Sequence, residues 1–135
     1  MTKQLKDPMD AAADMLGRRA YSSFDLSKKM VEKGYSKEVA QDTIDKLIEY
    51  GYLNDAEYAV RYTKILEERG KGNLYIKEKL KQSGIAEMPE TGDELERALA
   101  LLPKLEGKTP EQIGRRLLGL GFTPSVVYKI LAKLR

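Results

Sequence analysis

The side chains best suited to chemistry in this sequence are cations that recur along it at helical spacing. They fall in three short stretches, at Lys28, Lys29 and Lys33, at Lys77 and Lys81, and at Arg115 and Arg116. Lysine and arginine bind carboxylates and phosphates through charge-assisted hydrogen bonds. The pattern therefore indicates a binding protein whose partner is an acidic protein surface, a phosphate backbone or both.

A catalytic site is harder to build from this composition. The 135 residues include no histidine and no cysteine, which removes the commonest general base, the thiol nucleophile and the commonest metal ligands. The segment Gly70-Lys71-Gly72 lacks the Gly-Lys-Ser/Thr ending of a phosphate-binding P-loop, although Lys71 remains a candidate contact for an anion. We therefore expect no enzymatic activity, no cofactor and no metal site.

Further candidate contacts flank the basic stretches. Arg18, Arg19 and Tyr21 precede the first stretch, Arg61 lies between the first and second, and Tyr75 is next to the second. A tyrosine at an interface can stack and hydrogen-bond. The arginines could equally pair with acids of the same chain, and the lysines could simply form solvated helix faces.

The overall charge balance is mildly basic, with 24 Lys and Arg against 21 Asp and Glu and a net charge of +3. No run approaches the roughly 18 apolar residues that a membrane-spanning helix needs. The first residues lack the apolar core of a signal peptide. We expect a cytoplasmic protein.

Apolar residues recur at helical spacing along almost the whole chain, and no segment shows sustained strand alternation. Serine, threonine, asparagine and proline mark the helix starts, and glycine marks most of the ends. The pattern predicts eight short helices and no sheet, over residues 9–18, 22–34, 36–51, 54–70, 73–84, 95–103, 109–121 and 123–134.

Three of these helices share one pattern, in which two apolar residues four apart are followed by glycine and a further apolar residue. The copies are Leu26-Met30-Gly34-Tyr35, Ile76-Leu80-Gly84-Ile85 and Ile113-Leu117-Gly121-Phe122. Each predicts a helix with one apolar ridge and a glycine C-cap in the left-handed region. The alternative is a chance match of helix endings that are common in α-helical proteins.

The spacing of the copies predicts the domain organisation. Leu26 and Ile76 are 50 residues apart, whereas Ile76 and Ile113 are only 37 apart, so about one helix is missing from the middle unit. We therefore expect an all-α fold of tandem three-helix repeats at 9–54, 55–92 and 93–135, with the third helix of the middle repeat lost or irregular. Such repeats stack into an elongated curved ribbon.

The repeats resemble the RecX family, regulatory proteins that bind and modulate the RecA recombinase filament. The resemblance is carried by Arg19-Ala20-Tyr21-Ser22 with Leu26-Ser27-Lys28-Lys29-Met30, and by Gly51-Tyr52-Leu53-Asn54-Asp55 with Tyr58, Ala59, Arg61 and Tyr62. It is also carried by Gly72, Ile76, Leu80 and Gly84-Ile85, and by Gly121-Phe122-Thr123. The sequence departs from the family at Leu74, Tyr75, Gly119 and Leu120, where basic residues are usual.

We expect a monomer, because short repeats with local loops stack on one another within one chain. The resemblance implies that the protein acts in DNA recombination, DNA repair and the SOS response. Its partner would be the RecA–DNA filament, whose ATP turnover and strand exchange it would modulate, with direct binding to single- or double-stranded DNA as a further possibility. The alternatives are a helical DNA-binding module and a protein-interaction scaffold, both independent of RecA.

Overall fold

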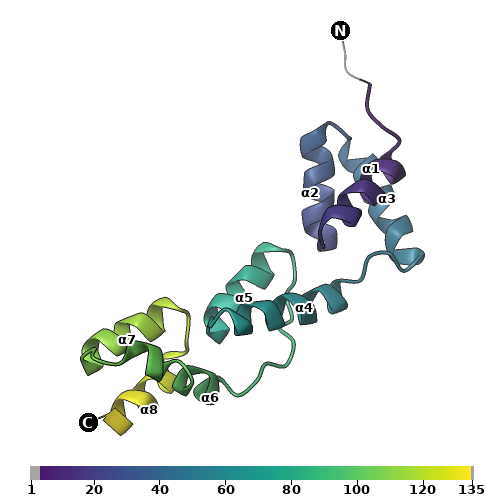
Figure 1. Cartoon of the computed structure of the whole chain (residues 1–135). Helices are drawn as coiled ribbons and strands as arrows, with labels where there is room; N and C mark the ends of the chain where they lie inside the picture. Colours follow the sequence, from purple (N-terminus) through teal and green to yellow (C-terminus); the bar gives the residue numbers. More distant parts are fainter. Residues whose placement is uncertain (1–3, 135) are drawn as a thin grey trace. The chain divides into compact units, whose positions relative to one another are not determined.

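The structure is a computed structural model that describes residues 4–134, and it is all-α over that range (Figure 1). The helices are α1 (Pro8–Arg18), α2 (Ser23–Lys33), α3 (Lys37–Glu49), α4 (Asp55–Glu68), α5 (Asn73–Gln82), α6 (Glu94–Leu99), the 3₁₀-helix η1 (Leu102–Leu105), α7 (Pro110–Gly119) and α8 (Pro124–Leu134). The prediction of eight helices and no sheet is confirmed for the described residues.

One predicted helix end is wrong. The segment expected to run from 95 to 103 ends as α6 at Leu99, and η1 follows it from Leu102. Proline has no N–H to donate, and its ring clashes with the carbonyl four residues earlier. Pro103 therefore cannot continue α6, and the chain makes a tighter 3₁₀ turn instead.

The chain divides into two compact units. One holds the residues up to 59 together with 83–85, and the other holds 60–82 together with the residues from 86 onward. The boundary falls inside α4, so the repeat boundaries at 54 and 92 and the stacked ribbon stay predictions. Residues 86–92 contain no helix.

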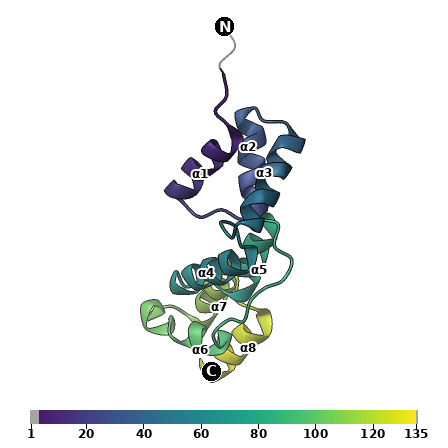
Figure 2. The same ribbon diagram turned by 90° about the vertical axis from the view of Figure 1, so that its right-hand side faces the viewer.

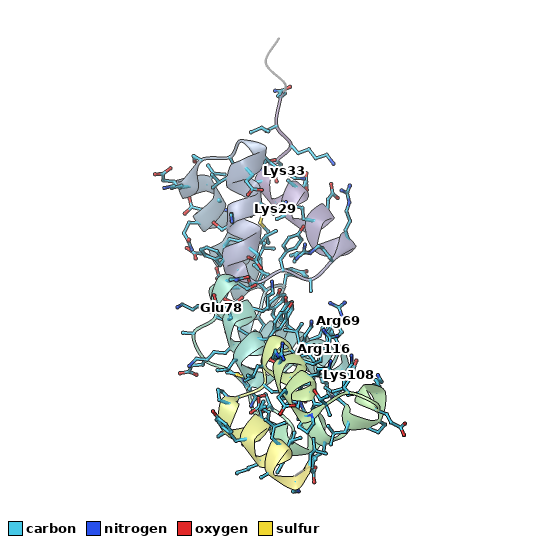
Figure 3. All side chains as sticks on the ribbon, turned by 90° about the vertical axis from the view of Figure 1, so that its left-hand side faces the viewer. Lys29, Lys33, Arg69, Glu78, Lys108 and Arg116 are labelled. Carbon is cyan, nitrogen blue, oxygen red and sulfur yellow. The ribbon has the colours of Figure 1, made fainter. Side chains whose placement is uncertain are left out.

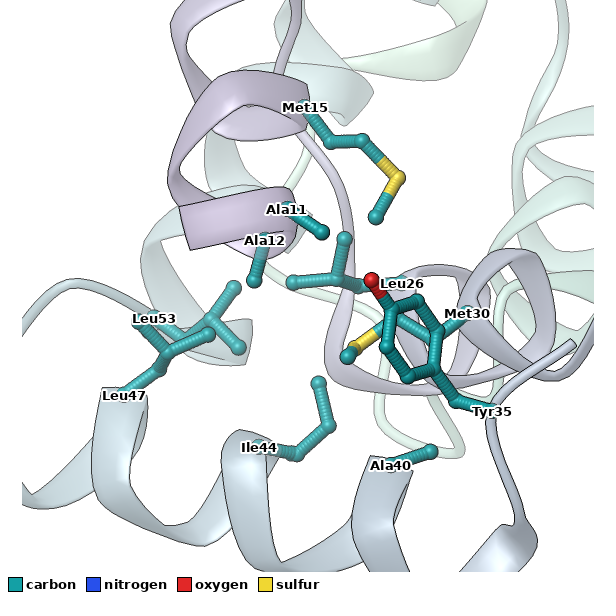
Figure 4. Close-up of a cluster of buried hydrophobic side chains, with 10 residues drawn as sticks. All are labelled: Ala11, Ala12, Met15, Leu26, Met30, Tyr35, Ala40, Ile44, Leu47 and Leu53. Carbon is teal, nitrogen blue, oxygen red and sulfur yellow. The ribbon is translucent and has the colours of Figure 1, made fainter. Parts of the chain in front are cut away.

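The first unit has its core where α1, α2 and α3 meet (Figure 4). Met15 of α1, Leu26 and Met30 of α2, and Ile44 of α3 are almost completely buried there. Each helix contributes residues three or four apart, which lie on one helical face. Full burial of such a side chain stabilises the fold by about 1.5–3 kcal/mol.

The second unit has a corresponding core among α6, η1, α7 and α8; α6, α7 and α8 lie together in Figures 1 and 2. Ala98, Leu105, Leu117, Phe122 and Ile130 are buried in this core. Thr109 caps α7 through a reciprocal pair of hydrogen bonds with Gln112, and Pro110 occupies the first helical position. The sequence prediction for this helix start is confirmed.

The three-fold pattern is also confirmed. The two apolar positions are 0–7% exposed in all three copies, and Gly34, Gly84 and Gly121 have φ of 116°, 78° and 93°. These angles favour glycine over any residue with a Cβ, so a left-handed glycine follows each of α2, α5 and α7.

A carboxylate holds the N-terminus of two of the three patterned helices, one in each unit. In the first unit, the backbone N–H of Ser23, the first residue of α2, donates to Asp55 Oδ1 at 2.8 Å. In the second, the N–H of Asn73, the first residue of α5, donates to Glu94 Oε2 at 2.8 Å. Asp55 and Glu94 are themselves the first residues of α4 and α6. Helix N-termini expose unpaired N–H groups and a positive dipole end, which the carboxylate satisfies.

The glycine C-caps lie against the same N-termini. A Cβ on Gly84 would lie 2.6 Å from Phe24 Cβ in the first unit. In the second unit, a Cβ on Gly121 would lie 2.4 Å from Tyr75 Cβ, and the Gly121 carbonyl accepts a hydrogen bond from the N–H of Leu74 at 2.9 Å. Glycine is therefore required at these positions by space as well as by φ.

We expect Gly121→Ala and Gly84→Ala to destabilise the protein by about 2 kcal/mol or more, because strain at positive φ adds to overlap with a neighbouring helix. Gly34→Ala should cost about 1 kcal/mol, since only the flexible Leu5 side chain lies near its Cβ position. The measurement is urea unfolding followed by circular dichroism. Gly119→Ala is the control, because it lies within α7 with open space around it and should be neutral or stabilising. Equal stability of all four variants would contradict the shared cap.

We expect Glu94→Ala to destabilise the protein by about 1–3 kcal/mol. The carboxylate accepts hydrogen bonds from the N–H of Asn73 and from the N–H and hydroxyl of Thr123, at 2.8, 3.2 and 2.6 Å. Glu96→Ala removes the same charge from an exposed position on α6 and should change the stability by less than about 0.5 kcal/mol. Thermal or urea unfolding of both variants provides the comparison, and equal losses would show that Glu94 acts only through its charge.

Candidate partner-binding surface

The cations predicted on the first patterned helix lie on its outer side. Lys28, Lys29 and Lys33 of α2 are exposed, whereas Leu26 and Met30 are buried in the core. Figure 3 labels Lys29 and Lys33. Lys29 Nζ lies 3.6 Å from Glu32 Oε2 one turn away. An exposed pair of this kind contributes little and breaks readily, so all three ammonium groups can reach a partner.

On α5, a tyrosine organises two lysines. The ammonium groups of Lys71 and Lys79 lie 4.7 and 5.5 Å from the centre of the Tyr75 ring. A cation over an aromatic face is attracted to it. Tyr75, Lys71 and Lys79 are half-buried, while Lys77 and Lys81 are exposed.

On α7, two arginines line an open groove of about 710 Å³. Arg115 and Arg116 form one wall together with Gln112, and Lys104, Leu105 and Lys108 of η1 and the following turn form the other. Gln112, Arg115 and Arg116 are three and four residues apart, so they share one helical face. Lys104 and Lys108 are contacts that the sequence patterns did not single out.

Comparison of the three helices from their first buried apolar residue shows which cations are equivalent. The third residue after it is Lys29 in α2, Lys79 in α5 and Arg116 in α7. We call this the common basic position. At 100° per residue, Lys77 of α5 lies on a different helical face from the common basic position. Glu78 of α5, labelled in Figure 3, stands at the position that Lys28 has in α2 and Arg115 has in α7. Counting three residues from the first buried apolar residue of each patterned helix identifies Lys79 from the sequence alone.

The remaining predicted contacts lie on α1, on the turn that follows it and on α4. The Arg19 guanidinium lies 4.3 Å from the centre of the Tyr21 ring, and Arg18 and Arg61 are exposed. Within residues 4–134, none of these three arginines forms an ion pair with an acid. Their interaction with a partner stays a prediction.

The shortest ion pair joins two exposed residues near the start of the chain. Lys6 Nζ lies 2.7 Å from Asp14 Oδ2, and this hydrogen bond lowers the pKa of the Asp14 carboxyl and raises the pKa of the Lys6 ammonium. The pair's stabilisation is thus present above the unfolded pKa of Asp14 and below the unfolded pKa of Lys6, and it is lost as the pH falls through the folded pKa of Asp14 or rises through that of Lys6. Solvent screens both groups, so the effect on stability is small.

The part of the chain that the structure describes offers neither a metal site nor a membrane span. No three or more Asp or Glu side chains there are grouped so that they could hold a metal ion. None of the described helices combines the length and the apolar character that crossing a membrane requires.

Comparison with known proteins gives one consistent family. A model described as RecX, first three-helix domain, matches residues 9–47. Regulatory protein RecX of Acidithiobacillus ferrooxidans is 31% identical over 140 residues, covering 97% of this chain and 93% of that protein. Regulatory protein RecX of Mannheimia succiniciproducens is 33% identical over 129 residues, covering 82% and 83%.

A solved structure agrees in fold. The crystal structure of RecX from Lactobacillus salivarius matches with a TM-score of 0.74 at 20% identity, over 94% of each chain. A second crystal structure, of regulatory protein RecX, matches with a TM-score of 0.71 at 21% identity, over 93% of this chain and 70% of the other. The all-α repeat fold expected from the sequence is therefore confirmed.

Proposed function

We propose, because this chain belongs to the RecX family of regulatory proteins, that it binds the RecA–DNA filament and modulates the recombinase without catalysing a reaction. It would act in the cytoplasm, in DNA recombination and repair and in the SOS response. Similarity over nearly its full length to relatives named regulatory protein RecX supports a regulatory role.

The observation that carries the proposal is the common basic position. Lys29, Lys79 and Arg116 follow the buried ridge of α2, α5 and α7 at the same distance, although the neighbouring positions differ. Nothing in the core requires a cation there, because the ridge residues already fill it. A cation that recurs from repeat to repeat suits a periodic acidic partner, and a nucleoprotein filament is one.

Regulation of this kind needs no catalytic group. A regulator whose affinity for the filament is higher than its affinity for free RecA shifts RecA toward the assembled filament. A regulator that prefers one state of the filament raises the population of that state, and ATP turnover or strand exchange changes with it. The shift is limited by the difference in binding free energy between the states. The tyrosine-anchored lysines and the arginines of α7 would supply part of that difference.

Direct DNA binding without a recombinase is the second candidate, and the exposed cations favour it as well. The two functions differ in one measurement. A RecX-like regulator should bind single-stranded DNA much more tightly when RecA and a nonhydrolysed nucleotide are present, whereas a plain DNA-binding module should not. Equal affinity for bare DNA and for filaments would contradict the proposed function.

We expect the triple variant Lys29→Gln, Lys79→Gln, Arg116→Gln to bind RecA filaments at least about tenfold more weakly at low salt, because each substitution removes one charge-assisted hydrogen bond. Its helicity should be unchanged. The control is Lys46→Gln, Lys64→Gln, Lys129→Gln, which removes the same charge from exposed positions on α3, α4 and α8. Fluorescence anisotropy with labelled filaments measures both. A folded triple variant that binds like the control would show that the common basic position is only a solvated face.

A further inference from the structure

The groove between η1 and α7 holds four cations and no acid. Its lining residues are Lys104, Leu105, Lys108, Gln112, Arg115 and Arg116. None of the four cations forms an ion pair in the part of the chain that the structure describes. The nearest acids along the sequence, Glu106 and Glu111, are exposed and do not line the groove. The groove therefore carries an uncompensated positive charge.

The hydrogen-bonding groups of the groove are donors. Lysine and arginine side chains donate only. Gln112 uses its side-chain oxygen to accept the N–H of Thr109 at 2.9 Å, so its Nε2 amino group is what it can offer a ligand. A ligand that fills this groove must bring several acceptor atoms and negative charge along its length.

The residues that line the groove favour nucleic acid over protein as its partner. Protein interfaces are built around apolar and aromatic anchors, whereas this groove has one apolar lining residue, the buried Leu105, and no aromatic ring. The apolar groove on the neighbouring face of α7, where Leu118, Val127 and Leu131 meet, shows the contrast. Long flexible cations without an aromatic platform are typical of contacts to phosphate oxygens.

We propose that this groove binds the phosphodiester backbone of a nucleic-acid strand. Lys104 and Lys108 contact the strand from one wall, and Arg115 and Arg116 contact it from the other, with phosphate oxygens as the acceptors. Because no base is read or stacked, binding is independent of sequence. The inference rests on the proposed function and deepens it, since it names the DNA of the filament as the component that this groove contacts.

The test is the anisotropy of a labelled oligothymidylate strand, without RecA, over a range of salt concentrations. We expect the full chain to bind it, and the variant Lys104→Gln, Lys108→Gln, Arg115→Gln, Arg116→Gln to bind at least about tenfold more weakly at low salt. The slope of log K against log salt should fall by up to about 3, at roughly 0.7 for each phosphate that the variant no longer neutralises. A mixed-sequence strand should give the same result as oligothymidylate.

Matched variants separate the groove from general charge. The variant Lys46→Gln, Lys64→Gln, Lys129→Gln, Lys133→Gln removes four exposed cations outside the groove and should lose much less affinity. Arg115→Lys with Arg116→Lys keeps the charge and should keep most of the binding. Lys104→Gln with Lys108→Gln leaves α7 intact, so an intermediate loss in this double variant supports the proposal even if the fourfold variant unfolds.

Three results would overturn the proposal. The first is that the full chain shows no detectable binding to the bare strand. The second is that the groove variant and its control lose the same amount of affinity. The third is that polyglutamate displaces the strand as effectively as a phosphodiester competitor does. Titration of the same variants against RecA filaments tests the proposed function separately. Filament binding that survives while bare-strand binding fails would refute the groove's assignment and leave the proposed function standing.

Discussion

The fold depends on how the N-terminus of each patterned helix is held. A helix that begins inside a protein must find acceptors for its first N–H groups, because water cannot reach all of them. Asp55 provides the acceptor for α2 and Glu94 for α5, and these carboxylates are the first residues of α4 and α6. Hydrogen bonds to an ionised acceptor are roughly twice as strong as neutral ones. The first turn of one helix therefore fixes the start of another that is distant in sequence.

The third patterned helix does not need this support. Pro110 occupies its first position and has no N–H to satisfy, and the Thr109–Gln112 capping box satisfies the N–H of Gln112 and that of Thr109 itself. No carboxylate has to cover the start of α7, so Thr109 and the turn before it stay exposed. Lys104, Lys108 and Gln112 flank this helix start and line the groove together with the two arginines.

The features that depend on neighbouring residues in the sequence could be predicted. The apolar pairs four residues apart, the left-handed glycines and the use of serine or threonine at helix starts all follow from local rules, and the structure confirms these features, with N-caps at Ser22, Ser36 and Thr109. The features that depend on distant partners could not be predicted. Nothing in the identity of Asp55 or Glu94 indicates a hydrogen bond to an N–H 32 or 21 residues earlier. Lys104 and Lys108 lie outside the three patterned helices, and only the folded chain brings them into one groove with Arg115 and Arg116.

The partly buried carboxylates of this chain stabilise the fold, whereas its exposed cations are available to a partner. The carboxylates that matter to the fold, Asp55 and Glu94, are partly buried and hydrogen-bonded, and their removal leaves donors without an acceptor. Lys28, Lys77 and Arg116 are exposed and contribute little to stability. Carboxylates that are hydrogen-bonded within the fold do not neutralise cations on the surface. The chain therefore presents cationic surfaces without compensating negative charge, although its net charge is only +3. Changes in the outer cations can therefore tune the affinity for a partner while the repeats keep their structure.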